Sequence, residues 1–240
     1  MVQTKCIFNW SGGKDSALAL YHCLQNPALD IRYLVTTIND AVDRISMHGV
    51  RTALLIKQAE SIGLPLYQIR LPEMPDMETY DRTMRAHLEH FKNEGITHSI
   101  FGDIFLEDLK KYRDDRLAEI GMTGIYPIWK RDSRELINEF LTLGFGTVIA
   151  CTQKHLERIL GREISEELLH SLPDDVDVCG ENGEFHTFTF KGPIFKDEIK
   201  YKTGEKVFKE YKAPADANNP CVTDPSKKRS GFWYCDLLPL

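Results

Sequence analysis

Residues 11–16 read Ser-Gly-Gly-Lys-Asp-Ser, and this stretch decides the fold that the sequence predicts. The apolar run Cys-Ile-Phe at 6–8 precedes it, and an Ala/Leu-rich stretch at 17–24 follows it. A strand, a tight glycine turn and the start of a helix can form an anion site. The glycines allow an unusual backbone path, and the N–H groups of the turn and of the first helical turn can point at one phosphate group.

The side chains of this stretch add to the same interpretation. Lys14 brings a positive charge, and Ser11 and Ser16 bring hydroxyl donors. The carboxylate of Asp15 repels phosphate, so we expect it to hold a metal ion or to orient a neighbour. The stretch is not the common P-loop, which has four residues between its first glycine and Gly-Lys-Ser/Thr. An ordinary glycine turn with a capped helix is the alternative, but such a turn requires fewer polar residues.

Strands and helices alternate through the first half of the sequence. Apolar periodicity predicts strands at 6–10, 31–38, 65–71, 98–101, 124–129 and 147–151, and helices at 16–24, 50–62, 77–93, 105–120 and 133–143. This alternation indicates an α/β protein with a doubly wound, mainly parallel sheet, in which ligands bind at the carboxyl ends of the strands. Ser11, Asn39 and Asp103 each follow a predicted strand, as that rule requires. Ser133 is the expected cap of the last of these helices.

The pattern changes after residue 151. We expect a helix over 152–171, strands at 185–190, 206–211 and 231–237, and an exposed loop over 213–230. The sequence therefore predicts a nucleotide-binding domain over residues 1–151 and a small α+β part over residues 152–240.

Bulk composition limits the classes of function. The chain has 240 residues, of which 42% are apolar, and a net charge of −6, which argues against broad binding of nucleic acid. It has six cysteines with no Cys-x-x-Cys pair, which argues against a zinc ribbon or a redox pair. No apolar run is long enough to span a membrane, and we expect a cytoplasmic protein.

A second polar stretch, Gly-Glu-Asn-Gly-Glu-Phe-His-Thr-Phe at 180–188, leads into a predicted strand. Glycine-rich loops that carry several polar groups often bind ligands. The alternative is a solvated turn, and the residues alone do not decide between the two.

The 11–16 stretch resembles the pyrophosphate loop of the N-type ATP pyrophosphatases. That resemblance implies the adenine nucleotide alpha hydrolase-like fold and a loop that grips the β,γ-pyrophosphate of ATP while the α-phosphate is attacked. From about residue 4 to residue 196, further motifs in order are similar to those of the diphthine–ammonia ligase family: Gly102-Asp103 with Arg113 and Arg116, Tyr126-Pro-Ile-Trp129, Cys179–Phe188, and Gly192-Pro-Ile-Phe195.

The family resemblance implies an ATP-dependent amide ligase. The enzyme would adenylate a carboxylate, release pyrophosphate and transfer ammonia from ammonium, and the family's acceptor is diphthine on translation elongation factor 2. The resemblance assigns the phosphate to Ser11, Gly12, Gly13, Lys14, Asp15 and Ser16. It assigns the acceptor to the C-terminal part, at Glu181, Asn182, Glu184 and His186. Eukaryotic members carry Tyr-Glu where this chain has Phe185-His186, which leaves the identity of the acceptor open.

Other residues are candidates from their place in the pattern. Asp103 ends a strand on the ligand side and could hold Mg²⁺ together with Asp15, or could cap the helix that follows it. We expect Lys14, Asp15 and Arg113 to act in catalysis, although Arg113 could instead pair with neighbouring carboxylates. Thr37, at the end of a strand, could bind adenine.

Two other functions stay open. One is a tRNA-modifying enzyme that adenylates a base, against which the negative charge and the missing Cys-x-x-Cys pair argue. The other is a nonenzymatic ATP-binding sensor, which would not need Lys14 and Asp15 together. A homo-oligomer is compatible with the sequence.

Overall fold

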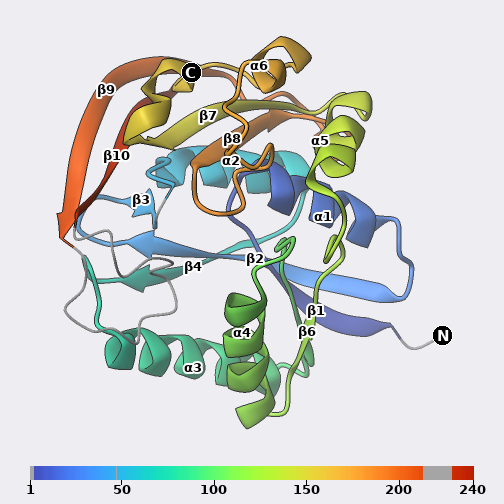
Figure 1. Ribbon diagram of the computed structural model, residues 1–240. Helices are drawn as coiled ribbons and strands as arrows, with labels where there is room; N and C mark the ends of the chain where they lie inside the picture. The colour runs from blue at the N-terminus through green and yellow to red at the C-terminus, as the bar shows by residue number, and fades with distance from the viewer. Residues whose placement is uncertain (1–2, 47, 213–228) are drawn as a thin grey trace.

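The computed structural model describes residues 3–46, 48–212 and 229–240. Its strands form two sheets, with helices α1 and α2 between them (Figure 1). The first sheet contains β1 (Thr4–Asn9), β2 (Leu29–Asn39), β3 (Arg44–Ile45), β4 (Leu66–Leu71), β5 (His98–Ile100) and β6 (Thr123–Ile125). The second contains β7 (Gly146–Gln153), β8 (Phe185–Lys191), β9 (Tyr201–Lys212) and β10 (Arg229–Pro239). The helices are α1 (Lys14–Leu24), α2 (Thr52–Ile62), α3 (Met77–Asn93), α4 (Glu107–Glu119), α5 (Ser133–Thr142), α6 (Glu166–His170) and a 3-10 helix (Lys154–Ile159).

The first sheet is mainly parallel and doubly wound, which confirms the predicted fold class. β1 lies in the middle, with β2 and then β4 on one side and β5 and then β6 on the other, all parallel. Short β3 is the exception and pairs antiparallel with β2. The order of strands reverses beside β1, so the 11–16 stretch leaves the sheet at the switch point where ligands bind in such folds.

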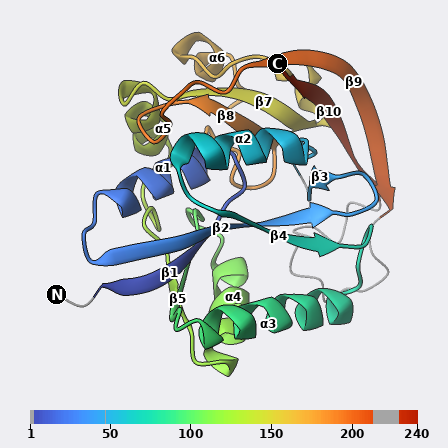
Figure 2. The same ribbon diagram turned by 180° about the vertical axis from the view of Figure 1, so that it is seen from behind.

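Helices cover both faces of this sheet (Figures 1 and 2). α3 and α4 lie on one face, while α1 and α2 lie on the other and also pack against the second sheet. The position between two sheets explains why residues Ala17–Leu20 are all buried, since a helix covered on every side is apolar all round. The second sheet thus reaches the helix that begins at the glycine turn.

The second sheet is antiparallel, with the order β8-β7-β10-β9. The predicted strand at 147–151 exists as β7, but our prediction of it as the last strand of the first half was wrong, because it pairs with β8 and β10. All positions of β7 except its last are buried, and such an apolar run does not reveal which sheet it joins. Where the chain divides into two domains therefore stays a prediction.

Two local predictions differ from the structure, and a third lies mostly outside the described residues. The single helix over 152–171 is replaced by the 3-10 helix and α6. Asp132, rather than Ser133, caps α5 and accepts hydrogen bonds from the N–H groups of Arg134 (2.9 Å) and Glu135 (3.0 Å). Residues 213–228, most of the predicted exposed loop, lie outside the described residues.

An ion-pair cluster ties the loop between β3 and α2 to the second sheet. Asp236 on β10 accepts two hydrogen bonds from Arg51, at 2.9 and 2.7 Å, and also pairs with Arg44 at 2.9 Å. Both arginines lower the pKa of Asp236, mainly through the hydrogen bonds of Arg51. His48 lies between the two arginines in sequence, so this cluster fixes the position of its loop.

Candidate active site

Hydrogen bonds within the 11–16 stretch and from β8 hold the glycine turn between β1 and α1. Gly12 has a φ of +74°, and a Cβ there would lie 2.7 Å from the Gln58 side-chain oxygen, so glycine is needed. Ser11 Oγ accepts from the Gly13 N–H (3.3 Å) and donates to Ser16 Oγ (3.0 Å). No side chain caps α1, and the N–H of Lys14 donates to Thr187 Oγ1 at 3.0 Å. Ser11 and Thr187 therefore hold the backbone of the turn that the sequence predicts to bind phosphate.

Lys14 points into the protein rather than into solvent. Only 3% of its side chain is exposed, and its ammonium group contacts the Asp15 carboxylate at 2.7 and 2.8 Å and donates to the Cys179 carbonyl. Burial alone would lower the pKa of Lys14, but Asp15, with smaller effects of Cys179 and Glu181, raises it above its ordinary value, so Lys14 is cationic. Burial raises the pKa of Asp15, and Lys14 opposes that effect. The two residues form one ion pair, in which Lys14 is buried and Asp15 is 29% exposed.

Residues 177–184 contain Glu181, Asn182 and Glu184, which are predicted to bind the acceptor, so we call them the acceptor segment. Hydrogen bonds from its own side chains hold this segment. Asp177 Oδ1 accepts from the N–H groups of Cys179 (3.0 Å) and Glu181 (3.1 Å). Glu184 Oε1 accepts from the Asp177 N–H (3.0 Å) and from Asn182 Nδ2 (3.1 Å). Glu184 is 6% exposed, and its Oε2 is buried with no partner among the described residues. The second polar stretch of the sequence is thus a structured loop rather than a solvated turn.

Glu181 connects the acceptor segment to the end of β5. Its Oε1 accepts from the Ile104 N–H at 2.8 Å and from the Phe105 N–H at 3.4 Å. Burial, followed by the charge of Asp15, raises the pKa of Glu181 to about 7, and Asp103 contributes in the same direction. The carboxylates of Asp15 and Asp103 therefore both act on Glu181 at this point.

Asp103 forms an ion pair with Arg113, whose guanidinium lies 4.6 Å from the centre of the Phe101 ring. Asp103 is not a helix cap, because α4 begins at Glu107. Gly102 packs closely against α1, since a Cβ there would lie 3.0 Å from the Ser16 backbone nitrogen. The contact between Gly102 and α1 places the Asp103–Arg113 pair beside the glycine turn.

His186 on β8 stacks against His48, with 4.4 Å between ring centres and 26° between planes. Burial lowers the pKa of His48 to about 4 and lowers the pKa of His186 well below its usual range. The positive charge of Lys14 lowers both pKa values further. Both rings are therefore neutral at pH 7. Nδ1 of His48 is buried without a hydrogen-bond partner among the described residues.

Among the described residues, no hydrogen bond or ion pair joins Thr37 to the other predicted site residues. Its carbonyl accepts from the Ser46 N–H at 3.2 Å, so this carbonyl is already used within the fold. The neighbouring Thr36 is 3% exposed, and its hydroxyl lacks a partner among the described residues. A role for Thr37 in binding adenine stays a prediction.

Gln58 and Thr187 both contact the glycine turn, and our sequence analysis did not select either one. The sequence does mark Gln58, because it is a polar residue in the apolar stripe of α2. It lies four positions after Leu54 and three after Leu55. Thr187 offers no comparable signal, because alternating threonines are typical of strands. The structure thus adds two polar groups to the predicted site.

Neither metal ligands nor membrane-spanning helices stand out in the described ranges. No three His, Cys, Asp or Glu side chains there are grouped so that they could hold a metal ion. None of the described helices combines the length and apolar character needed to cross a membrane.

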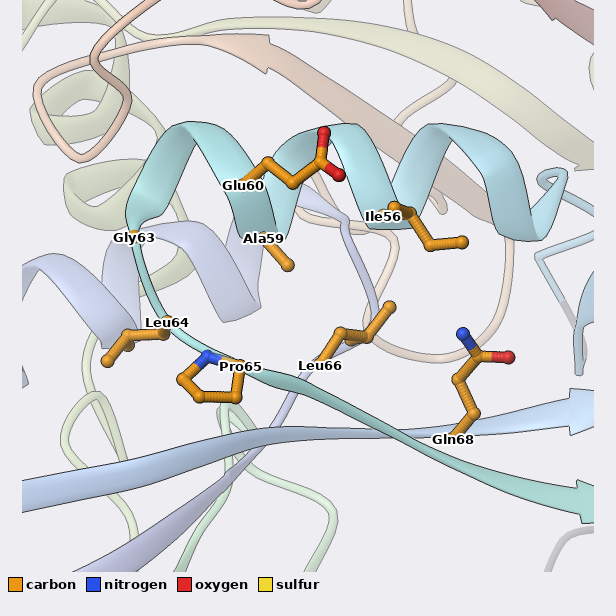
Figure 3. A pocket seen from close by; sticks show the side chains of 8 residues that line it. All are labelled: Ile56, Ala59, Glu60, Gly63, Leu64, Pro65, Leu66 and Gln68. Atoms are coloured by element: carbon orange, nitrogen blue, oxygen red, sulfur yellow. The ribbon is translucent and has the colours of Figure 1, made fainter.

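A groove of about 400 Å³ lies between α2 and β4, away from this site (Figure 3). Ile56 and Leu66 line it from the helix and the strand, with Glu60 and Gln68 as polar residues. None of its lining residues belongs to the predicted site.

Comparison with known proteins finds one family over most of the chain. The model described as diphthamide synthase N-terminal domain matches residues 4–124, and that described as diphthamide synthase C-terminal domain matches residues 132–218. A zebrafish (Danio rerio) diphthine–ammonia ligase is 28% identical over 211 residues, which cover 79% of this chain and 83% of that protein. The rat (Rattus norvegicus) and human (Homo sapiens) diphthine–ammonia ligases are 26% and 25% identical, each over 82% of this chain and 82% of the relative.

Proposed function

Since the chain belongs to the diphthamide synthase family, we propose that it is an ATP-dependent amide ligase of the diphthine–ammonia ligase type. It adenylates a carboxylate, releases pyrophosphate and transfers ammonia to the activated carbonyl. The relatives named diphthine–ammonia ligase match most of their own length, which supports an assignment of the whole reaction.

The observation that carries this proposal is the direct contact between the glycine turn and the acceptor segment. Lys14 donates through its ammonium to the Cys179 carbonyl of this segment, and through its backbone N–H to Thr187 on β8, the strand that follows it. An AMP-forming ligase must bring its acceptor to the α-phosphate of ATP, so the two binding regions must meet. Here Lys14 belongs to the glycine turn and contacts the acceptor segment directly.

The chemistry divides into two steps. An acceptor carboxylate oxygen attacks the α-phosphorus, the bond from that phosphorus to the bridging oxygen breaks, and pyrophosphate leaves. Ammonia then attacks the acyl carbon, AMP leaves, and the nitrogen loses a proton to give the amide. We assign Ser11 and the N–H groups of the glycine turn to the departing pyrophosphate, because preorganised donors stabilise developing negative charge. Lys14 holds the acceptor segment in place for both steps.

Mg²⁺ is the cofactor that we propose for the first step, held by Asp15 and Asp103. These side chains offer the oxygen ligands that Mg²⁺ prefers. A divalent cation would also offset the negative charge of Asp15 and Asp103, which raises the pKa of Glu181. Magnesium sites of this kind use one or two carboxylates together with phosphate oxygens, so a three-ligand protein cluster is not required. Bound Mg²⁺ would neutralise charge on the phosphates. An Asp103→Asn variant should need more Mg²⁺ for half-maximal activity.

For the acceptor we propose the diphthine residue of a translation factor, whose cationic group an aromatic surface would bind. Lys110 places its ammonium 4.4 Å from the centre of the Tyr126 ring and 5.7 Å from that of Trp129, so this aromatic pair already accommodates a cation. Diphthine carries a quaternary ammonium group beside its carboxyl group, which suits such a surface. Glu181, Asn182, Glu184 and His186 are the proposed acceptor-side residues. A cytoplasmic location and a homo-oligomer stay predictions.

Product analysis tests the proposed function. The protein is incubated with ATP, Mg²⁺, ammonium and elongation factor 2 carrying diphthine, and the nucleotides are separated. We expect AMP and pyrophosphate in amounts that match amide formation on the factor. ADP and orthophosphate as products, or AMP release that does not depend on the acceptor, would contradict the proposal.

A further inference from the structure

Gln58 on α2 is a fully buried amide in direct contact with the glycine turn. Its exposed fraction is 0%, and both the nitrogen and the oxygen of its side-chain amide are hydrogen-bonded. Nε2 donates to the Gly12 carbonyl (3.0 Å) and to the Thr189 carbonyl (2.6 Å), while Oε1 accepts from Trp10 Nε1 (2.9 Å). The indole N–H can only donate and the two carbonyls can only accept, so these partners fix which end of the amide is which.

The contact with Gly12 determines how the next peptide group is oriented. The peptide is planar and trans, so a carbonyl on one side places the following N–H on the opposite side. The Gly12 carbonyl is held by Gln58 and by the Thr189 N–H (2.8 Å). The Gly13 N–H therefore points the other way, toward Ser11 Oγ at 3.3 Å.

Without these two donors the turn would have a second conformation available, and Gln58 is the one of the two that a side-chain substitution can remove. Glycine populates positive and negative φ about equally well, and Gly12 is followed by another glycine. Nothing in the covalent structure prevents the peptide between them from turning over. A hydrogen bond from a side chain that cannot move is a direct way to hold one orientation.

We infer that Gln58 is a positioning residue for the proposed ATP site, and that it holds the Gly13 N–H and the Ser11 hydroxyl that this N–H contacts on the side of the turn where the pyrophosphate of the nucleotide would bind. The inference rests on the proposed function, because it needs the glycine turn to bind ATP. Gln58 does not touch the nucleotide itself. It acts through the main chain of Gly12, and it links that main chain to α2, β8 and Trp10.

The test compares ligands that use different parts of the site. Gln58→Met keeps the length of the side chain and removes all three hydrogen bonds. We expect the Kd of the variant for ATP and for magnesium pyrophosphate to rise by roughly 10- to 100-fold, as for the loss of a hydrogen bond to a charged group. The Kd for AMP, which lacks the β- and γ-phosphates, should rise less than about threefold by the same reasoning. Isothermal titration calorimetry measures all three.

Ser61→Ala is the matched control on the same helix. Ser61 is 9% exposed and exchanges two hydrogen bonds with the backbone of Asp197, at 2.7 and 3.0 Å, and among the described residues its hydroxyl makes no hydrogen bond to the glycine turn. Its loss should lower the melting temperature without changing the Kd for pyrophosphate. If Gln58→Met does not fold, Trp10→Phe removes the donor that orients the amide, and a smaller loss confined to ATP and pyrophosphate is expected.

The outcomes separate the two proposals. Unchanged pyrophosphate affinity in the Gln58 variant, or an equal loss for ATP, pyrophosphate and AMP, would overturn the positioning role alone. Failure of the wild-type protein to bind ATP would overturn the proposed function, and the positioning role with it.

Discussion

The ammonium group of Lys14 donates a hydrogen bond to the main-chain carbonyl of Cys179, which lies 165 positions later in the chain. The same ammonium is paired with Asp15 at the first turn of α1. One cation thus joins the glycine turn to the acceptor segment, and its removal should affect both stability and activity.

Lys14→Ala should lower the free energy of unfolding by about 2 kcal/mol, because it leaves the partly buried Asp15 carboxylate and the Cys179 carbonyl without their partner. Urea unfolding measures this change. The double variant Lys14→Ala/Asp15→Ala should recover part of the loss, since no unpaired charge then remains. A double variant less stable than Lys14→Ala would show that the pair is not the source of the effect.

Ser11→Ala should separate activity from stability. Within the described part of the chain, the Ser11 hydroxyl hydrogen-bonds only with Gly13 and Ser16, so its removal should leave the melting temperature nearly unchanged. Turnover should fall by roughly 10²–10³-fold, the usual cost of losing one preorganised donor. AMP release measures turnover. Ser171→Ala is the control, since Ser171 makes a local hydrogen bond to the Leu168 carbonyl outside the site. Wild-type turnover in Ser11→Ala would place the phosphate elsewhere.

Glu184→Gln should weaken use of the acceptor more than binding of ATP. The amide oxygen of glutamine can still accept from Asp177 and Asn182, so the change mainly removes the charge of the buried Oε2. We expect the KM for the acceptor to rise by about tenfold or more, with little change in the Kd for ATP. Acceptor titration and calorimetry measure the two separately. A large loss of ATP affinity with an unchanged acceptor KM would mean that this segment closes over the nucleotide.

Stability should fall on acidification because of the stacked pair His48 and His186. Their pKa values lie below the ordinary value in the folded protein, so the unfolded chain takes up these protons first. The contribution of the pair is complete above about pH 6.5 and is lost as the pH falls from there toward 4. His186→Phe retains a stacking partner for His48 and should reduce this loss by on the order of 1 kcal/mol.

Melting curves of wild type and His186→Phe between pH 4 and 8 measure the difference. Glu181 acts in the opposite direction, because its raised pKa favours the folded state at low pH. Both proteins contain Glu181, so its effect cancels in the comparison. Parallel pH profiles for the two proteins would contradict the prediction.

Local patterns in the sequence predicted most of the elements and not all of their partners. α3 begins and ends at the predicted residues, because a long amphipathic stretch with capping signals is unambiguous. β7 was predicted as a strand but assigned to the wrong sheet, because strand pairing depends on contacts far along the chain. The two-residue β3 is too short to leave a periodic pattern.

The candidate site shows the same limit. The motif at 11–16 and the segment at 180–188 are visible as motifs, and the structure brings them together. The contacts that join them use the backbone carbonyl of Cys179 and the hydroxyl of Thr187, which no residue pattern identifies. The burial of Lys14 likewise follows from the second sheet packing over α1, which the sequence alone does not show.

The salt bridges of Asp236 have a consequence for how the molecule folds. Arg51 and Asp236 are 185 positions apart, so their contact closes a very long stretch of chain. Contacts of such separation cost chain entropy before they add stability, and they form late. The amides of Ile45 and Gly49, hydrogen-bonded within the loop that these salt bridges hold, should therefore exchange with deuterium only when β10 detaches. Their exchange rates would report that opening directly.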